Sequence, residues 1–254
     1  MIDKTVATAG EAVADIPSGA SIAVGGFGLS GAPMALIEAL LAQGAGDLDI
    51  VSNNCGVDDW GLGLLLGAGR IRRMTSSYVG ENKEFERRYL SGELELVLTP
   101  QGTLAEKLRA GGAGIAAFFT RTGVGTQVAE GGLPVKYAAD GTIAVASSPK
   151  EVRVFGGHEY VLEEGIATDF ALLHAAIGDR HGNLVFHKAT RQFAPLAAQA
   201  GRTTIVQVEH LVEPGEIDPE HVHLPGVYVH RVIEVGPDVE KRIEKRTVRA
   251  PGGN

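Results

Sequence analysis

The sequence predicts an α/β protein with an open, mainly parallel sheet flanked by helices. Short apolar runs alternate with stretches of helical periodicity through the first half of the chain, a pattern typical of βαβ units and a largely parallel sheet. One of these runs, residues 22–24, leads into a glycine-rich loop and then into a helical pattern at residues 34–41. Hydrophobic residues form 44% of the 254 residues, which is enough for a substantial core.

The expected elements follow from the two periodicities. In the first half of the chain we expect four strands, at residues 22–24, 48–51, 74–78 and 94–98. Three helices are expected between and after them, at residues 34–41, 81–90 and 103–110. Two further strands are expected nearer the end of the chain, at residues 170–176 and 205–208. The charged segment at residues 238–249 is expected to be an exposed tail.

The middle of the chain, about residues 111–165, has a different character. Helical periodicity gives way there to loops and short strand-like runs, at residues 143–147, 152–155 and 160–162. This pattern predicts a small β-rich part, either an insertion or an extension of the same sheet. Since there is no internal repeat and no long linker, we expect residues 1–254 to form a single domain that includes this β-rich extension.

The composition argues against several classes of protein. A net charge of −8 would repel nucleic acid. No apolar run approaches the ~18 residues of a membrane span, and the first residues lack the pattern of a signal peptide. The single cysteine, Cys55, excludes an intramolecular disulfide and fits a reducing compartment, so we expect a cytoplasmic protein. No metal site is expected, because His221 and His223 lack the companions of a metal-ligand motif.

The glycine-rich loop, residues 25–31, is the most informative segment. A strand followed by a glycine loop and a helix can turn backbone amides toward an anion. Gly26, Gly28 and Gly31 also match the G-x-G-x-x-G pattern of dinucleotide-binding proteins. Those proteins need an acidic residue at the end of the next strand, whereas here that strand ends in a serine and two asparagines. A dinucleotide-binding oxidoreductase is therefore the weaker interpretation, from a different class of function.

Four blocks of sequence carry a resemblance to a known family. The loop block, residues 22–33, has three apolar residues, Gly-Gly-Phe, three free positions and then Gly-x-Pro. The other blocks are residues 52–66, 76–104 and 109–126. In this order, along essentially the whole chain, they resemble the family I CoA-transferases, and within that family the A subunits of the succinyl-CoA:3-ketoacid (3-oxoacid) enzymes. The resemblance implies a sheet of the NagB/RpiA-like type.

The resemblance also implies a reaction and a partner. Enzymes of this family pass CoA from an acyl-CoA to a second acid through covalent intermediates on a glutamate. That glutamate lies in a Ser-Glu-Asn-Gly motif of a separate B subunit, and this motif does not occur in the present sequence. We therefore expect a B-type partner in an A₂B₂ assembly, with acyl-CoA and small acids as substrates and no permanently bound cofactor. Glu81 lacks the motif context, so we expect a helix-start carboxylate there.

Three sets of site residues are expected, the first from the resemblance and the others from their places after the strands at residues 48–51 and 22–24. Gln101 matches the glutamine beside the catalytic glutamate, where its amide would stabilise developing negative charge; a helix cap is the alternative. Asn53 and Asn54 are expected to donate hydrogen bonds to substrate, although asparagine suits a turn equally well. The loop residues expected to contact the CoA substrate are Gly25, Gly26, Phe27, Gly28, Leu29, Ser30 and Gly31. For Phe27, packing into the core is the alternative.

The acceptor acid depends on the far end of the substrate pocket. We expect acetoacetate, and 3-oxoadipate or acetate are the alternatives within the same class of enzyme. The second carboxylate of 3-oxoadipate would need a cation, because an unpaired carboxylate in an apolar pocket is costly. Arg121 stands where the family often has proline and is the candidate for that cation. Cys55 has no histidine in its block, so we expect a buried structural thiol.

Overall fold

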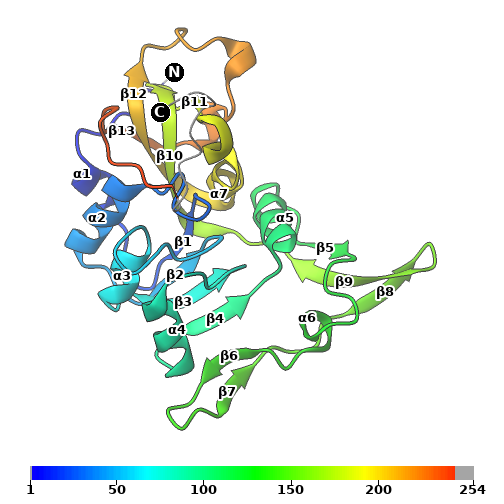
Figure 1. Ribbon diagram of the computed structural model, residues 1–254. Helices are drawn as coiled ribbons and strands as arrows, with labels where there is room; N and C mark the ends of the chain where they lie inside the picture. Colours follow the sequence, from blue (N-terminus) through cyan, green and yellow to red (C-terminus); the bar gives the residue numbers. More distant parts are fainter. Residues whose placement is uncertain (1, 244–254) are drawn as a thin grey trace, which may run out of the picture.

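A parallel sheet runs through the centre of the molecule (Figure 1). The computed structural model describes residues 2–243, so the expected tail beyond residue 243 lies outside the described residues. Within these residues the sheet has eight strands: seven follow the order β13-β12-β10-β1-β2-β3-β4, and β11 pairs antiparallel with β10. Its strands are β1 Ser21–Val24, β2 Leu48–Val51, β3 Ile71–Ser76, β4 Glu95–Leu98, β10 Thr168–Asp179, β11 Leu184–Val185, β12 Gly201–Val212 and β13 Arg231–Glu234. The predicted fold class is confirmed.

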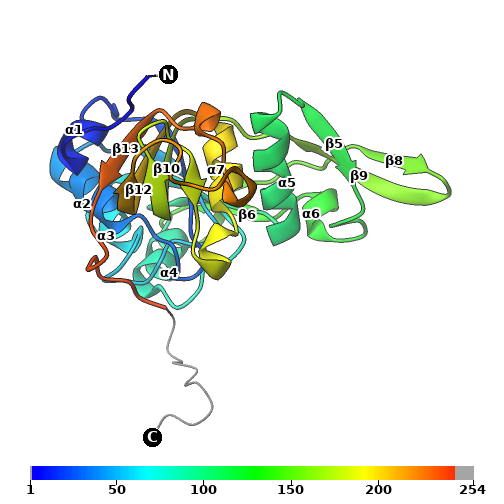
Figure 2. The same cartoon turned by 90° about the horizontal axis from the view of Figure 1, so that it is seen from above.

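Helices cover both faces of this sheet (Figure 2). One face carries α1 Ala9–Val13, α2 Met34–Gln43, α3 Gly63–Gly67 and α4 Lys83–Leu90. The opposite face carries α5 Gln101–Gly112 and α7 Ala194–Ala200. Each face has its own buried core, because successive side chains of a strand point to opposite faces of the sheet. Ile22 packs toward α2, whereas Ala23 packs toward α7. The described residues contain no helix that is long and apolar enough to cross a membrane.

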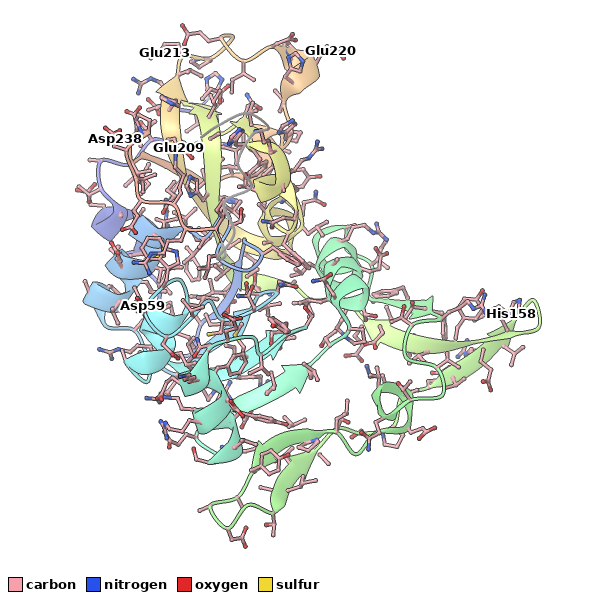
Figure 3. The ribbon with its side chains drawn as sticks, viewed as in Figure 1. Asp59, His158, Glu209, Glu213, Glu220 and Asp238 are labelled. Carbon is pink, nitrogen blue, oxygen red and sulfur yellow. The ribbon has the colours of Figure 1, made fainter. Side chains whose placement is uncertain are left out.

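The β-rich part projects away from the main sheet (Figure 1). It forms two separate antiparallel sheets, so it is an insertion and does not extend the main sheet. The first sheet has the order β5-β9-β8, and His158 marks the far end of its β8–β9 hairpin in Figure 3. The elements of this part are β5 Ala117–Thr120, α6 Gln127–Glu130, β6 Pro134–Tyr137, β7 Ile143–Ala146, β8 Val152–Phe155 and β9 His158–Glu164.

A buried carboxylate ties this projecting part to the core. Glu163 is only 2% exposed and accepts a hydrogen bond from Lys107 Nζ of α5 at 2.9 Å. Its other oxygen bonds Lys150, which precedes β8. On the other side of the β-rich part, the Tyr89 hydroxyl of α4 donates to the carbonyl of Pro134 at 2.8 Å.

Several boundaries differ from those expected. The strand expected at residues 74–78 is β3, Ile71–Ser76, and Tyr78 lies in the loop after it. The helix expected from residue 81 begins at Lys83, because the Asn82 side chain caps it by accepting from the Phe85 N–H. The helix expected from residue 103 already begins at Gln101. Short elements such as α1, α3, α7 and β13 were not expected, nor were three 3₁₀ turns, Lys188–Arg191, Pro219–His221 and Gly226–Tyr228.

Candidate functional site

The predicted site residues meet at the carboxyl ends of neighbouring parallel strands. The glycine loop leaves the end of β1, Asn53 follows β2, Ser77 follows β3 and Gln101 follows β4. The strand order reverses beside β1, which has β2 on one side and β10 on the other. Open α/β sheets bind their ligands at such a switch point, outside the carboxyl ends of the strands. The topology therefore brings residues about 75 positions apart in the sequence to a single edge.

The glycine loop is a tight turn, and at three of its positions the backbone has a φ angle that favours glycine. Gly26, Gly28 and Gly31 have φ angles of 120°, 58° and 78°, in the region that side chains disfavour. Phe27 and Ser30 pair through two backbone hydrogen bonds of 3.0 Å, which close the turn. The three glycines of the G-x-G-x-x-G pattern are thus the positions at which this turn has a positive φ angle.

Asn54 holds this loop in place. Its Oδ1 accepts from the Gly28 N–H at 3.0 Å, and its Nδ2 donates to the Gly28 carbonyl at 3.1 Å. Asn54 is only 7% exposed, so both hydrogen bonds form away from bulk water. Asn54 therefore stabilises the turn of the glycine loop, because its side-chain amide pairs with the Gly28 backbone as a neighbouring peptide group would.

Asn53 connects Gln101 to the same network. Asn53 Oδ1 accepts from Gln101 Nε2 at 2.8 Å and from the Ser77 hydroxyl at 2.7 Å. Asn53 Nδ2 in turn contacts Asn54 Oδ1 at 3.3 Å. A hydrogen-bonded chain therefore runs from Gly28 through Asn54 and Asn53 to Gln101, although Gln101 is 48 residues from Asn53 in the sequence.

Gln101 is the exposed end of this chain. It is the first residue of α5, and its helix has Pro100 as N-cap without a side-chain capping bond. An amide nitrogen carries two hydrogens, so the bond to Asn53 fixes the orientation of Nε2 and leaves its second hydrogen for a ligand. The helix-capping alternative does not match this geometry, because the side chain bonds Asn53.

The helix that follows the glycine loop does not offer a fully open first turn. The Leu36 N–H of α2 donates to Oε1 of Gln207, a fully buried side chain of β12, at 3.3 Å. Gly25, Phe27, Gly28 and Ser30 also donate their backbone N–H groups to atoms of this chain. An anion could therefore use only a few of the amides that the loop and helix carry.

Large apolar side chains stand exposed around the carboxyl edge. Phe27 is 46% exposed, Tyr78 is 56% exposed and Leu98 is 45% exposed. Phe27 is therefore not packed into the core, which was the alternative for this residue. Exposed aromatic and aliphatic side chains beside a polar group are typical of a surface that a ligand or a partner covers.

The other candidate residues are Cys55, Glu81 and Arg121. Cys55 is fully buried, and burial raises the pKa of its thiol well above the ordinary range, which suits a structural role. Glu81 directly precedes the N-cap of α4, and Arg121 lies exposed in the turn after β5. Within residues 2–243, no group of three or more His, Cys, Asp or Glu side chains is placed to hold a metal ion.

Comparison with known proteins identifies the family. The family model for coenzyme A transferase matches residues 6–235, and the chain belongs to this family. It is 66% identical to the A subunit of a probable succinyl-CoA:3-ketoacid coenzyme A transferase from Mycobacterium tuberculosis, over 98% of this chain and 100% of that one. A Bacillus subtilis protein of the same description is 52% identical, over 98% of this chain and 97% of the other.

Longer relatives carry a matching half. The human mitochondrial succinyl-CoA:3-ketoacid coenzyme A transferase 2 is 52% identical over 94% of this chain, which spans only 46% of the human protein. Among solved structures, an acyl-CoA transferase from Escherichia coli, seen as a thioester complex with CoA, matches with a TM-score of 0.77 and 25% identity. The match covers 93% of this chain and 48% of that one. Glutaconate coenzyme A-transferase from Acidaminococcus fermentans shares the fold, with a TM-score of 0.75 and 21% identity over 92% and 76% of the two chains.

Proposed function

We propose that this chain is the A subunit of a succinyl-CoA:3-ketoacid CoA-transferase, working with a B subunit that supplies the catalytic glutamate. Two observations support this proposal: the relatives of that description match almost the whole chain, and the sequence contains no Ser-Glu-Asn-Gly motif. The observation that carries the role of this chain is the network ending at Gln101, whose Nε2 is bonded to Asn53 at the carboxyl edge and keeps a second amide hydrogen.

The proposed reaction exchanges CoA between two acids. A carboxylate oxygen of the partner's glutamate attacks the thioester carbon of succinyl-CoA, and the C–S bond breaks to give an anhydride and the CoA thiolate. The thiolate then attacks the glutamyl carbonyl and releases succinate, leaving a glutamyl-CoA thioester. Acetoacetate reverses these two steps and leaves as acetoacetyl-CoA, so atoms and charges balance. Each attack places negative charge on a carbonyl oxygen, and Gln101 Nε2 donates a hydrogen bond to it.

The other residues of the network have supporting roles in this proposal. Asn53 orients Gln101, and Asn54 holds Gly28 so that the loop residues Gly25 to Gly31 form one wall for the acyl-CoA. Each asparagine Nδ2 donates one hydrogen within the protein and carries a second, so we assign both residues to positioning as well as to substrate contact. The exposed Phe27 and Tyr78 would be covered by the B subunit and by substrate in an A₂B₂ assembly.

A reconstitution assay tests the proposed function. The purified chain alone should form no acetoacetyl-CoA from succinyl-CoA and acetoacetate, and addition of a matching B subunit should produce turnover. Turnover by the chain alone, with an intact mass that excludes a partner, would refute it. Transfer to 3-oxoadipate or acetate in preference to acetoacetate would instead select one of the same-class alternatives. Binding of NAD but not CoA in calorimetry would favour the oxidoreductase interpretation.

A further inference from the structure

The segment that follows β13, residues 237–243, forms a strap beside β12 (the red segment after β13 in Figure 1). Two cations hold the strap in place. Lys241 Nζ bonds Oε2 of Glu209, in β12, at 2.6 Å, and the guanidinium carbon of Arg242 lies 4.2 Å from the centre of the Trp60 ring. The strap and the end of the glycine loop line one cavity of about 130 Å³. The strap is therefore attached to the main sheet close to the proposed site.

Glu209 connects the strap to a buried histidine of the neighbouring strand. Its second oxygen, Oε1, lies 3.0 Å from Nε2 of His174, in β10. The His174 side chain is only 8% exposed. Its other ring nitrogen, Nδ1, lies 3.4 Å from the carbonyl oxygen of Ala32, which directly follows the glycine loop. His174 therefore bridges the carboxylate that binds the strap and the end of the loop.

Both neighbours of the His174 ring are hydrogen-bond acceptors. A carbonyl oxygen cannot donate, and an ionised carboxylate only accepts. Burial raises the pKa of Glu209, but hydrogen bonds from Lys241 and His174 outweigh it and place this pKa below its ordinary value. A neutral imidazole has a single N–H, so the two bonds of His174 form together only when the ring carries both protons. The buried ring is then a cation, paired with the carboxylate that also binds the strap.

Side chains from three parts of the chain hold the glycine loop at successive backbone groups. Asn54 bonds Gly28, and Gln192 Nε2 donates to the carbonyl of Ser30 at 3.2 Å. The contact of His174 with the carbonyl of Ala32 is the third of these points. Of the three, it is the one that the strap reaches through a carboxylate. A chain of three hydrogen bonds therefore links the strap to the end of the loop.

We propose that His174 is a positioning residue for the acyl-CoA, and that the strap fixes it in place through Lys241 and Glu209. This inference rests on the proposed function, in which loop residues 25–31 form one wall for the acyl-CoA. His174 acts on that wall and not on the reacting atoms. Loss of the chain of bonds should weaken binding of the acyl-CoA in the ground state and the transition state alike. Such a loss raises KM and leaves kcat unchanged.

Two replacements of His174 separate its two bonds in the reconstituted two-subunit complex. Glutamine is the longer side chain, so its amide nitrogen stands near the position of Nε2 and still donates to Glu209 but not to Ala32. Asparagine is shorter, so its amide nitrogen stands near the position of Nδ1 and still donates to Ala32. We expect His174→Gln to raise KM for succinyl-CoA by about tenfold with kcat little changed, and His174→Asn to raise KM less. Packing alone would give the opposite order, because asparagine leaves the larger void.

Replacement of Lys241 tests the link to the strap. Lys241→Met removes the ammonium group and keeps a long side chain, and we expect KM for succinyl-CoA to rise by about threefold to tenfold. In the His174→Gln background the same replacement should have no further effect on KM, because the bond to Ala32 is already absent. Lys241→Arg keeps a cation for Glu209 and should restore a near-normal KM.

Glu240 provides the matched control on the strap. It is the exposed neighbour of Lys241 and bonds Arg242 at 3.1 Å, so Glu240→Gln should leave KM unchanged. Amide exchange in the full chain gives a readout that needs no activity. Exchange in residues 28–32 should become faster in Lys241→Met and should stay the same in Glu240→Gln, because only the first variant breaks the chain of bonds to the loop.

Three results would overturn the inference. They are an unchanged KM in both His174 variants, a Lys241→Met effect that adds in full to that of His174→Gln, and equal exchange in the Lys241→Met and Glu240→Gln chains. Each is compatible with normal transfer of CoA by the unmodified complex, in which case the proposed function stands. Absence of transfer by the unmodified complex would instead refute the proposed function, and the exchange measurement would still decide whether the strap holds the loop.

Discussion

The side-chain amide of Asn54 hydrogen-bonds both the N–H and the carbonyl of Gly28, at 3.0 and 3.1 Å. Of the side chains with this shape, only an amide offers a donor and an acceptor together, since aspartate has no donor and leucine has neither. Gly28 has a φ of 58°, and a free glycine backbone would also adopt other conformations. The two hydrogen bonds therefore select this one. The same two bonds tie the loop to the residues that follow β2.

Replacement of Asn54 should therefore loosen the glycine loop. Asn54→Asp places a second oxygen against the Gly28 carbonyl, and Asn54→Ala leaves both backbone groups without their partner. Each unsatisfied buried group costs about 1–3 kcal/mol, so the free energy of unfolding should fall measurably in denaturant titrations. Aspartate should be at least as harmful as alanine. Full stability in the aspartate variant would show that the loop does not need the donor.

A side chain at Gly28 should damage use of acyl-CoA more than it damages folding. Gly28→Val forces a branched side chain into the left-handed region, at a cost of about 1–2 kcal/mol. Gly44, which ends α2 with a φ of 95° and has open space around it, provides a matched control. Gly44→Val should lose similar stability and keep normal KM for succinyl-CoA. Equal kinetic effects in the two variants would reduce the loop to a structural turn.

Gln101 should contribute to the chemical step. Gln101→Ala removes the amide donor, so the rate of the chemical step should fall by about 10²–10³ in single-turnover measurements. Ser77 still bonds Asn53 in this variant, so the network and the melting temperature should change little. Gln101→Glu should be at least as slow, because a second carboxylate would repel the partner's glutamate and the incoming acids. Normal single-turnover rates in the alanine variant would exclude this role.

The projecting β-rich part should depend on Glu163. Glu163→Gln removes the charge that pairs Lys107 and Lys150, which should cost up to about 3 kcal/mol, because the pair with Lys107 is largely buried. Amide exchange in β8 and β9 should increase, and exchange in β1 and β2 should not. Glu164 is the exposed neighbour, and Glu164→Gln serves as the control with little expected effect. Similar exchange in both variants would mean that the ion pairs do not anchor this part.

The main sheet could be predicted from the sequence because its apolar strands alternate with helical segments. The sequence predicts the start of β3 three residues too far along the chain, at residue 74 instead of Ile71. Two charged residues near its start, Arg72 and Arg73, do not fit the apolar run that indicates the strand. Across the sheet, Arg72 bonds Asp49 at 2.6 Å and Arg73 bonds Glu95 at 2.9 Å. These cross-strand pairs make the charges compatible with the strand, and a single segment does not reveal them. The helix α7 was missed because its seven residues, mostly alanine, show little periodicity.

The site could be predicted in part. Gln101 and the two asparagines could be proposed as site residues from the sequence, but the hydrogen bonds that join them depend on β2, β3 and β4 lying side by side. Ser77 was overlooked as a member of the network, although one signal was available: it follows a parallel strand, as Asn53 and Gln101 do. The arrangement of the β-rich insertion could not be predicted, because β5 pairs with β9 across about 40 residues of sequence.

Intact-mass spectrometry of both subunits shows which of the two chains carries the attacking carboxylate. The reconstituted complex is mixed with succinyl-CoA in the absence of an acceptor acid and quenched in acid within one turnover. We expect the B subunit to gain the mass of CoA less one water, as a glutamyl-CoA thioester, and this chain to keep its unmodified mass. The Gln101→Ala complex should accumulate the same adduct more slowly. An adduct on this chain would refute the proposed function, because it would place the attacking carboxylate in this chain and not in the B subunit.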